Sequence, residues 1–299
     1  MTLRFLLFGL GRLFQWQWLR KGNCGMARYN AAEHWSDVAT KAGGRGGRGR
    51  LVAGDDAPYY RYKRRLFLQK FLSQIPTEDK SILEVGCGPG GNLVELLRRN
   101  PKRLVGCDVA PAMVEAARQE REAEGAEIVL IDGESLPFAD QEFDLSFTVT
   151  VLMHNPEQRK AQIIGEMCRT TRSQIYLIED TFPPSPSARA ATTEDEASGG
   201  IGAYGSFFPR AVGEYADSCA KGGFALVDTQ YLETFASHYL FAFLSTRLDK
   251  QRTAEGEGFS RLHWGVETAM QPLTRQLDRV IRRPGGELTL MVFERQRPF

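Results

Sequence analysis

Glycines in one short turn are the residues of this chain best suited to bind a ligand. Gly86, Gly88 and Gly91 fit the pattern G-x-G-x-x-G and follow directly after the apolar run 82–85. Because glycine has no Cβ, the backbone of such a turn can approach a ligand closely. The helix that begins after the turn offers free N–H groups to an anionic group. The pattern alone is ambiguous, since a dinucleotide-binding fold shows it as well.

Three carboxylates lie in or at the end of three successive apolar segments. Glu84 lies inside the first segment, two residues before the first glycine, while Asp108 ends the segment 104–108 and Asp132 ends the segment 128–132. Each acid alone is compatible with an ordinary turn at a strand end. Together, three acids on three successive strands indicate one binding site, because ligands of open α/β sheets bind at the carboxyl ends of the strands.

The elements that position these residues predict an open α/β sheet. Strand 82–85, the glycine turn and a helix over 92–99 form its first unit, with apolar residues on one face of the helix. The remaining expected strands are 104–108, 128–132, 144–149, 174–180, 224–231 and 287–294, and the remaining expected helices are 26–35, 58–72, 111–124, 156–168, 209–221, 238–248 and 259–281.

This series of strands, glycines and acids resembles the class I, seven-stranded S-adenosylmethionine-dependent methyltransferases. The resemblance is tight over residues 81–181, the expected cofactor-binding core, and loose elsewhere. It implies a doubly wound α/β fold with a mostly parallel seven-stranded sheet and a terminal antiparallel strand. The chain departs from the family between strands six and seven, where a helical insertion over 236–285 replaces a short hairpin; we interpret it as a cap or a dimerisation element.

The resemblance also implies roles for individual residues. Glu84 would meet the ammonium group of S-adenosyl-L-methionine, Asp108 would accept hydrogen bonds from both ribose hydroxyls, and Asp132 would accept one from the adenine amino group. A carboxylate has two acceptor oxygens, which suits a vicinal diol. The full set of expected cofactor-binding residues is Glu84, Gly86, Cys87, Gly88, Gly90, Asn92, Asp108, Val109, Met113, Asp132, Gly133, Glu134, Thr148 and Val149.

Catalysis leaves a fainter signal than cofactor binding, because methyl transfer mainly requires positioning and exclusion of water. His154, after strand four, is the candidate general base; its alternative is a packing residue under the cofactor. Glu179 and Asp180, at the end of strand five, are further candidates for substrate contact. The helix over 58–72 borders the cofactor in the family, so its residues Tyr59, Tyr60, Tyr62 and Arg64 either reach the methionine carboxylate or pack on the sheet.

Charge is unevenly distributed along the 299 residues. The net charge is +1, but residues 1–65 hold 13 Lys and Arg against 4 Asp and Glu, a net of +9. We expect residues 1–50 to form a basic, flexible arm ahead of a methyltransferase domain over 51–299, with Met26 the favoured natural start. Residues 182–207, rich in Pro, Ser and Gly, predict a lid-like loop. The five cysteines are scattered, so we expect neither disulfides nor a metal site, and a cytoplasmic location.

The favoured function is methyl transfer to a small-molecule or lipid- or sugar-linked metabolite, with S-adenosyl-L-homocysteine as product. Three alternatives stay open: an RNA or protein methyltransferase that uses the basic arm, an NAD-dependent oxidoreductase, and a non-catalytic binding module. No specific nucleic acid partner is expected. Peripheral membrane contact through residues 1–20 is a less favoured alternative, and a dimer through the helical insertion is left open.

Overall fold

A computed structural model describes residues 30–43, 57–182, 208, 210–254, 258–281 and 288–296. Most of the expected arm and of the loop 182–207 lies outside these ranges. Within the arm, α2 (Ala31–Gly43) is a helix that contacts α5, so the opening helix lies slightly later than expected and that part of the arm is ordered.

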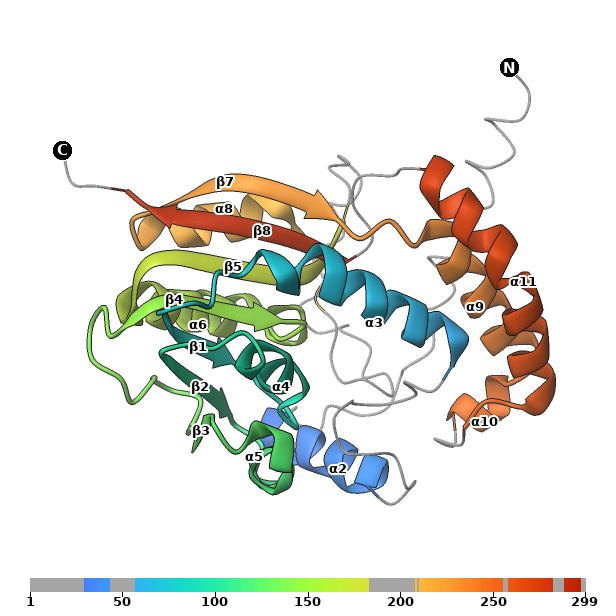
Figure 1. Ribbon diagram of the computed structural model, residues 1–299, viewed down its shortest axis with the longest axis horizontal. Coiled ribbons are helices and arrows are strands. Elements are labelled where there is room, and N and C mark those ends of the chain that lie inside the picture. The colour runs from blue at the N-terminus through green and yellow to red at the C-terminus, as the bar shows by residue number, and fades with distance from the viewer. Residues whose placement is uncertain are drawn as a thin grey trace.

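A single mixed sheet organises the molecule, and its strands run in the order β3-β2-β1-β4-β5-β8-β7 (Figure 1). The short β6 pairs with β5 outside this path. β8 is antiparallel to both of its neighbours, whereas the other main strand pairs are parallel. The strands are β1 (Ser81–Val85), β2 (Arg103–Asp108), β3 (Glu127–Leu130), β4 (Phe143–Val149), β5 (Thr171–Phe182), β6 (Arg210–Ala211), β7 (Phe224–Tyr231) and β8 (Leu288–Arg295).

The sheet order confirms the predicted fold class and argues against the dinucleotide alternative. A dinucleotide-binding sheet continues in parallel beyond its fifth strand. Here the last strand of the chain inserts between β5 and β7 and runs the opposite way.

Helices cover both faces of the sheet and its carboxyl edge (Figure 1). One apolar cluster joins α3 and α4 to the sheet, and a second joins α6 and α8 to the opposite face. The helices are α3 (Pro58–Lys70), α4 (Gly91–Leu97), α5 (Pro111–Gln119), α6 (Glu157–Thr170), α8 (Val212–Lys221), α9 (Phe235–Arg247), α10 (Lys250–Ala254) and α11 (Arg261–Val280), with single turns at η1 (Leu72–Gln74), η2 (Arg121–Ala123) and η3 (Leu152–His154).

Several predicted boundaries need correction. The helix expected over 111–124 ends at Gln119, because Glu120 is extended and its side chain caps the separate turn η2. The helix expected from Phe259 begins at Arg261, where the Ser260 hydroxyl accepts the N–H of His263 and caps the helix. β5 is longer than expected at both ends.

Helices α9, α10 and α11 form the cap predicted between the last two strands. They lie beyond the end of the sheet towards which the arrows of β4 and β7 point, which is the carboxyl edge of the parallel strands (Figure 1). Of the helices in the described ranges, none has the length and apolar character needed to cross a membrane.

Candidate active site

The turn between β1 and α4 brings the backbone against the segment that follows β4. Gly86, Gly88 and Gly90 all have positive φ, at +74°, +51° and +84°, a region that L side chains rarely adopt. A Cβ added at Gly86 would lie 2.3 Å from a methyl group of Val151. The turn therefore requires glycine for both backbone conformation and space.

Glu84 is buried directly before this turn and keeps one oxygen without a hydrogen-bond partner. Its side chain is 1% exposed, and Oε1 accepts a hydrogen bond of 2.7 Å from Nδ2 of Asn92. Oε2 has no partner. Burial raises the pKa of Glu84 to about 8, although the Asn92 hydrogen bond and the charge of Arg64 oppose the rise. A buried carboxylate oxygen without a donor is suited to a ligand that brings a cationic N–H group.

Arg64 and Asn92 hold Glu84 in place from α3 and α4. Arg64 donates through Nη1 to Oδ1 of Asn92 at 2.7 Å and through Nη2 to the carbonyl oxygen of Gly91 at 3.1 Å. With Oδ1 taken by Arg64, the amide nitrogen of Asn92 faces Glu84. Asn92, predicted to contact the cofactor, is thus the bridge between a cation and the buried carboxylate.

Asp108 ends β2, the strand next to β1, and is 9% exposed. Its Oδ2 accepts the N–H of Gly88 and its Oδ1 accepts the N–H of Ala110, both at 2.9 Å. Burial raises the pKa of this carboxyl, and the two N–H donors oppose the rise. Each oxygen has a second lone pair, so the carboxylate remains able to accept two ligand hydroxyls.

The third acid lies at an open edge of the site. Asp132 is exposed; its Oδ1 accepts the N–H groups of Glu134 and Ser135, and these bonds lower its pKa. Gly133 has φ +80°, and a Cβ there would lie 3.1 Å from a methyl group of Val109. The structure thus brings Val109, Gly133 and Asp132 together, but it does not enclose the acid.

Three of the remaining predicted residues are buried side chains, and two are more open. Cys87 is 5% and Met113 2% exposed, and Thr148 is fully buried with an Oγ1 that has no hydrogen-bond partner. Val149 is half-buried, whereas Glu134 is exposed and pairs with Arg159 at 3.3 Å.

Glu179 has a role that the sequence did not reveal. Its carboxylate, fully buried in β5, accepts the backbone N–H groups of Val151, Leu152 and Met153 at 3.0–3.1 Å. Burial raises its pKa to about 7 despite these donors. Glu179 therefore fixes the segment after β4 that packs against Gly86. The sequence signal for this role was the position of Glu179 inside an apolar strand, since a buried carboxylate needs hydrogen-bond donors.

His154 lies in η3, directly after that segment. The side chain is 6% exposed, and its ring meets the Trp35 ring edge-on, with centroids 5.1 Å apart. This contact matches the packing alternative, and a role as general base stays a prediction.

A second polar group forms where α3 meets the cap. The Tyr59 hydroxyl lies 3.2 Å from Nδ1 of His238 and 3.4 Å from Oγ1 of Thr234. The surrounding protein and Lys63 lower the pKa of His238, whereas Asp180 raises it. The His238 side chain is exposed, so solvent limits the extent to which its pKa is lowered.

The tyrosines of α3 face the cap. Tyr59 stacks on Phe241 of α9, and Tyr62 lies against Arg275 of α11. Of the four candidates on this helix, Arg64 alone is tied to the Glu84 network by the contacts described above.

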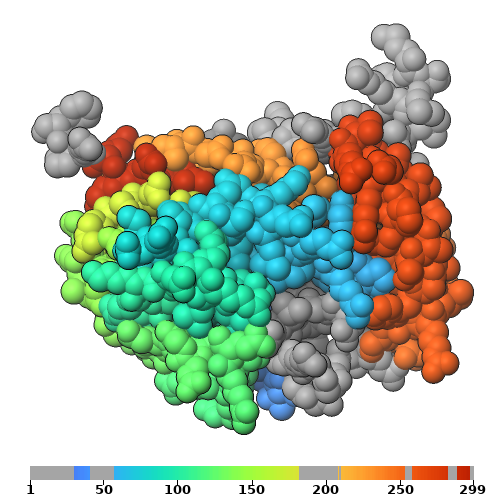
Figure 2. Space-filling model, in the orientation of Figure 1, coloured from blue at the N-terminus to red at the C-terminus, as the bar shows by residue number. Residues whose placement is uncertain are grey.

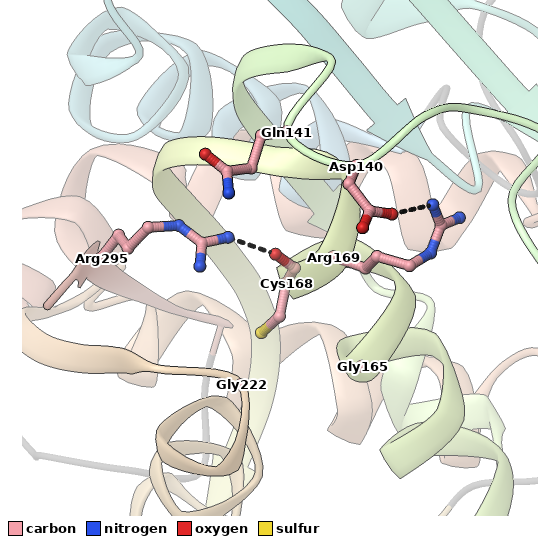
Figure 3. Close-up of a pocket in the computed structure, with 7 residues that line it drawn as sticks. All are labelled: Asp140, Gln141, Gly165, Cys168, Arg169, Gly222 and Arg295. Atoms are coloured by element: carbon pink, nitrogen blue, oxygen red, sulfur yellow. Dashed lines mark hydrogen bonds and ion pairs between the residues drawn. The ribbon is translucent and has the colours of Figure 1, made fainter. Parts of the chain in front are cut away.

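A separate pocket of about 280 Å³ lies where β4 and β5 begin, at the end of the sheet opposite the glycine turn (Figure 3). Arg169 donates there to Asp140 at 2.9 Å, and Arg295 donates to the carbonyl oxygens of Cys168 and Thr171. Arg169 thus ties the end of α6 to the segment before β4, and Arg295 ties β8 to the end of α6 and the start of β5. We assign this pocket a structural role.

Comparison with known proteins places the glycine turn, Glu84 and Asp108 in a methyltransferase domain. A family described as "Methyltransferase domain" matches residues 82–174. The phthiotriol/phenolphthiotriol dimycocerosates methyltransferase of Mycobacterium leprae (strain TN) is 35% identical over 114 residues, which cover 38% of this chain and 42% of that protein. The demethylmenaquinone methyltransferase of Thermus thermophilus is 33% identical over 126 residues, which cover 41% and 55%. The chain thus spans about half, or less, of the length of these relatives.

Solved structures agree on the fold. The geranyl diphosphate C-methyltransferase of Streptomyces coelicolor A3(2) superposes with a TM-score of 0.52 at 16% identity, over 89% of this chain and 96% of that one. At that identity the likeness concerns the fold alone. The unpartnered oxygen of Glu84, the buried Asp108 and the glycine turn between them fit the ammonium and ribose groups of S-adenosylmethionine. Residues 82–174 therefore match a methyltransferase domain, and the sheet has the order typical of class I methyltransferases, which use S-adenosylmethionine as cofactor.

Proposed function

We propose that this chain transfers a methyl group from S-adenosylmethionine to a small-molecule or lipid-linked acceptor. The observation that carries the proposal is the pair of buried carboxylates, Glu84 and Asp108, on adjacent strands beside a turn of left-handed glycines. When bound, S-adenosylmethionine supplies a methyl group on a positively charged sulfur.

The chain's own residues bind the cofactor and orient it. Oε2 of Glu84 accepts from the ammonium group, and Asp108 accepts from the ribose hydroxyls while Gly88 and Ala110 keep its carboxylate in place. Val109 and Asp132 lie beside the adenine, at the open edge. Glu179 holds the backbone after β4 and so keeps one wall of the site fixed.

The proposed acceptor class rests on the relatives and on the inner side of the cap. The relatives are named for phthiotriol dimycocerosates and demethylmenaquinone, and one structural neighbour for geranyl diphosphate. In this chain, aromatic side chains meet where α3 contacts α9: Tyr59 stacks on Phe241 with centroids 4.9 Å apart, and Tyr60 meets the same ring edge-on. Tyr60 and Phe241 are half-buried, so this aromatic cluster can contact an apolar acceptor, and His238 and Asp180 add polar groups beside it.

Turnover tests the proposal directly. The chain is incubated with methyl-labelled S-adenosylmethionine and a fractionated cell extract, and we expect label in the lipid or small-molecule fraction. Label confined to RNA or protein would contradict the acceptor class. Binding of S-adenosylmethionine without transfer to any fraction would support a non-catalytic binding module. Calorimetry should detect S-adenosylmethionine and not NAD.

Cofactor binding should release a proton, because Glu84 has a pKa of about 8 in the free protein. Below that pH the carboxyl is protonated, yet the ammonium group requires a carboxylate. Affinity should therefore rise with pH towards about 8, and fall above it as the cofactor's α-amino group, with an ordinary pKa of about 8, loses its own proton. At about pH 6.5, calorimetry in two buffers of different ionisation enthalpy should report nearly one proton released per cofactor bound.

Glu84→Gln is the matched control for this measurement. The amide cannot titrate, so we expect weaker binding with no proton release and little pH dependence over the same range. Equal proton release from the two proteins would show that Glu84 is not the group that meets the cofactor.

Asp180→Asn should lower turnover and leave cofactor affinity unchanged. Oδ1 of Asp180 is buried without a hydrogen-bond partner near the end of β5, and the carboxylate acts electrostatically on His238. We expect kcat/KM for the acceptor to fall by about tenfold or more. Asp140→Asn, at the opposite end of the sheet, is the control and should behave like the parent. Unchanged kcat/KM in Asp180→Asn would remove Asp180 from the acceptor site.

A further inference from the structure

Helix α11 is oriented with its polar side inward. The residues that face α3 and α9 are polar or charged, are at most 5% exposed, and recur every three or four positions: His263, Glu267, Gln271, Thr274 and Asp278. An amphipathic helix of a globular protein normally turns its apolar stripe to the core. The arrangement here is the reverse.

The apolar residues of α11 form a stripe on the outside. Leu262 is 62% exposed, Leu273 52% and Val280 80%, and Met270 and Leu277 are also exposed. Their spacing of three, four or eight places them along one side of the helix. Two further apolar residues of the cap are exposed, Phe243 on α9 and Leu248 directly after it. We call these seven residues the outer cap face.

Buried hydrogen bonds fix this orientation. Asp278 accepts from the Ser237 hydroxyl at 2.6 Å and from the N–H of Ala236 at 2.6 Å. Nδ1 of His263 lies 2.7 Å from Oδ2 of Asp249, and both side chains are fully buried. A rotation of α11 about its axis that buried the leucines would break these hydrogen bonds or expose them to water, so the apolar stripe stays outside.

The charges beside the outer cap face select its partner. On α9 and α11 the exposed charged side chains are all arginines, Arg247, Arg261 and Arg279, while both carboxylates of these helices are buried. Two copies paired antiparallel through α11 would bring Arg261 of one copy near Arg279 of the other, and like charges oppose that contact. Residues 1–25 contain four basic residues and no acidic one, so the same repulsion disfavours that segment as the occupant.

We propose that the outer cap face rests on an anionic phospholipid bilayer. An interfacial helix combines an apolar stripe with Arg or Lys beside it, and its affinity grows with buried apolar area and with attraction to anionic lipids. The cap helices form one side of the molecule, outside the cofactor-binding core (Figure 2). This side adjoins the carboxyl edge of the sheet, so a bound bilayer would lie beside the end of the sheet that carries Glu84 and Asp108. The inference stands on α11 and does not require the proposed reaction.

Vesicle flotation of the full chain tests this surface. We expect binding to vesicles of phosphatidylcholine with phosphatidylglycerol, weaker binding to phosphatidylcholine alone, and weakening at high salt. Leu273→Gln with Leu277→Gln should weaken binding by about tenfold or more. Leu226→Gln with Val227→Gln alters exposed apolar residues of β7 and should have no effect. Arg261→Glu with Arg279→Glu should remove the preference for anionic vesicles.

Other outcomes would overturn the proposal. Full vesicle binding by the α11 leucine variant would do so, as would loss of all binding on deletion of residues 1–25 alone. A parent that sediments as a dimer and becomes monomeric only in the leucine variant would assign the face to a second copy instead. Circular dichroism checks that each variant is folded, and if the leucine variant unfolds, the exposed arginine variant decides the question.

Discussion

Replacing Asp108 with alanine will weaken binding of S-adenosylhomocysteine by more than tenfold. The carboxylate ends β2 beside the glycine turn and is held by the N–H groups of Gly88 and Ala110. Alanine removes both acceptors for the ribose hydroxyls, which lowers the free energy of binding by about 1–3 kcal/mol. It also leaves two backbone donors without their partner, which lowers the free energy of unfolding by a similar amount. Isothermal titration calorimetry measures the change directly.

Two further variants separate binding from folding in this experiment. Asp108→Asn keeps one acceptor oxygen, so its affinity should fall between those of the parent and the alanine variant. Asp140→Ala removes an exposed carboxylate at the far end of the sheet and should bind like the parent. If Asp108→Ala binds with unchanged affinity while folded, the carboxylate does not contact the ribose and the assignment of the site fails.

Gly86→Ala is the second change with a large expected effect. Its φ of +74° is unfavourable for alanine, and the new Cβ would lie 2.3 Å from a methyl group of Val151. We expect a loss of about 1–3 kcal/mol in the free energy of unfolding and at least a tenfold loss of cofactor affinity, since the strain displaces the turn that forms the floor of the site. Denaturant unfolding and calorimetry measure the two effects.

Matched variants isolate the cause. Gly165→Ala lies inside α6, where an added Cβ meets nothing within 4 Å; it should stabilise the protein by about 0.5–1 kcal/mol, as alanine does in a helix. Val151→Ala combined with Gly86→Ala should relieve the side-chain clash and leave the backbone strain, so it should restore stability in part. A Gly86→Ala protein as stable as the parent would mean that the turn does not need its left-handed glycine.

Most of the elements around the cofactor were predictable because their signals are local. Strand 82–85, the glycine turn, Asp108 and the helix after Pro111 depend on apolar period and turn chemistry within a few residues. Element ends were less certain: α5 stops at Gln119, where Glu120 leaves the helical conformation.

The sequence alone determined the fold class and pointed to the acids and glycines expected to bind the cofactor, because Glu84 lies within a strand, Asp108 ends one and the glycines follow one. Tertiary structure alone decided which side chains meet: Arg64 orients Asn92 towards Glu84, and Glu179 holds the backbone after β4. It also decided that α11 turns its apolar stripe outward. That choice depends on partners elsewhere in the cap, such as Asp249 and Ser237, and a helix's own periodicity cannot encode which of its sides finds such partners.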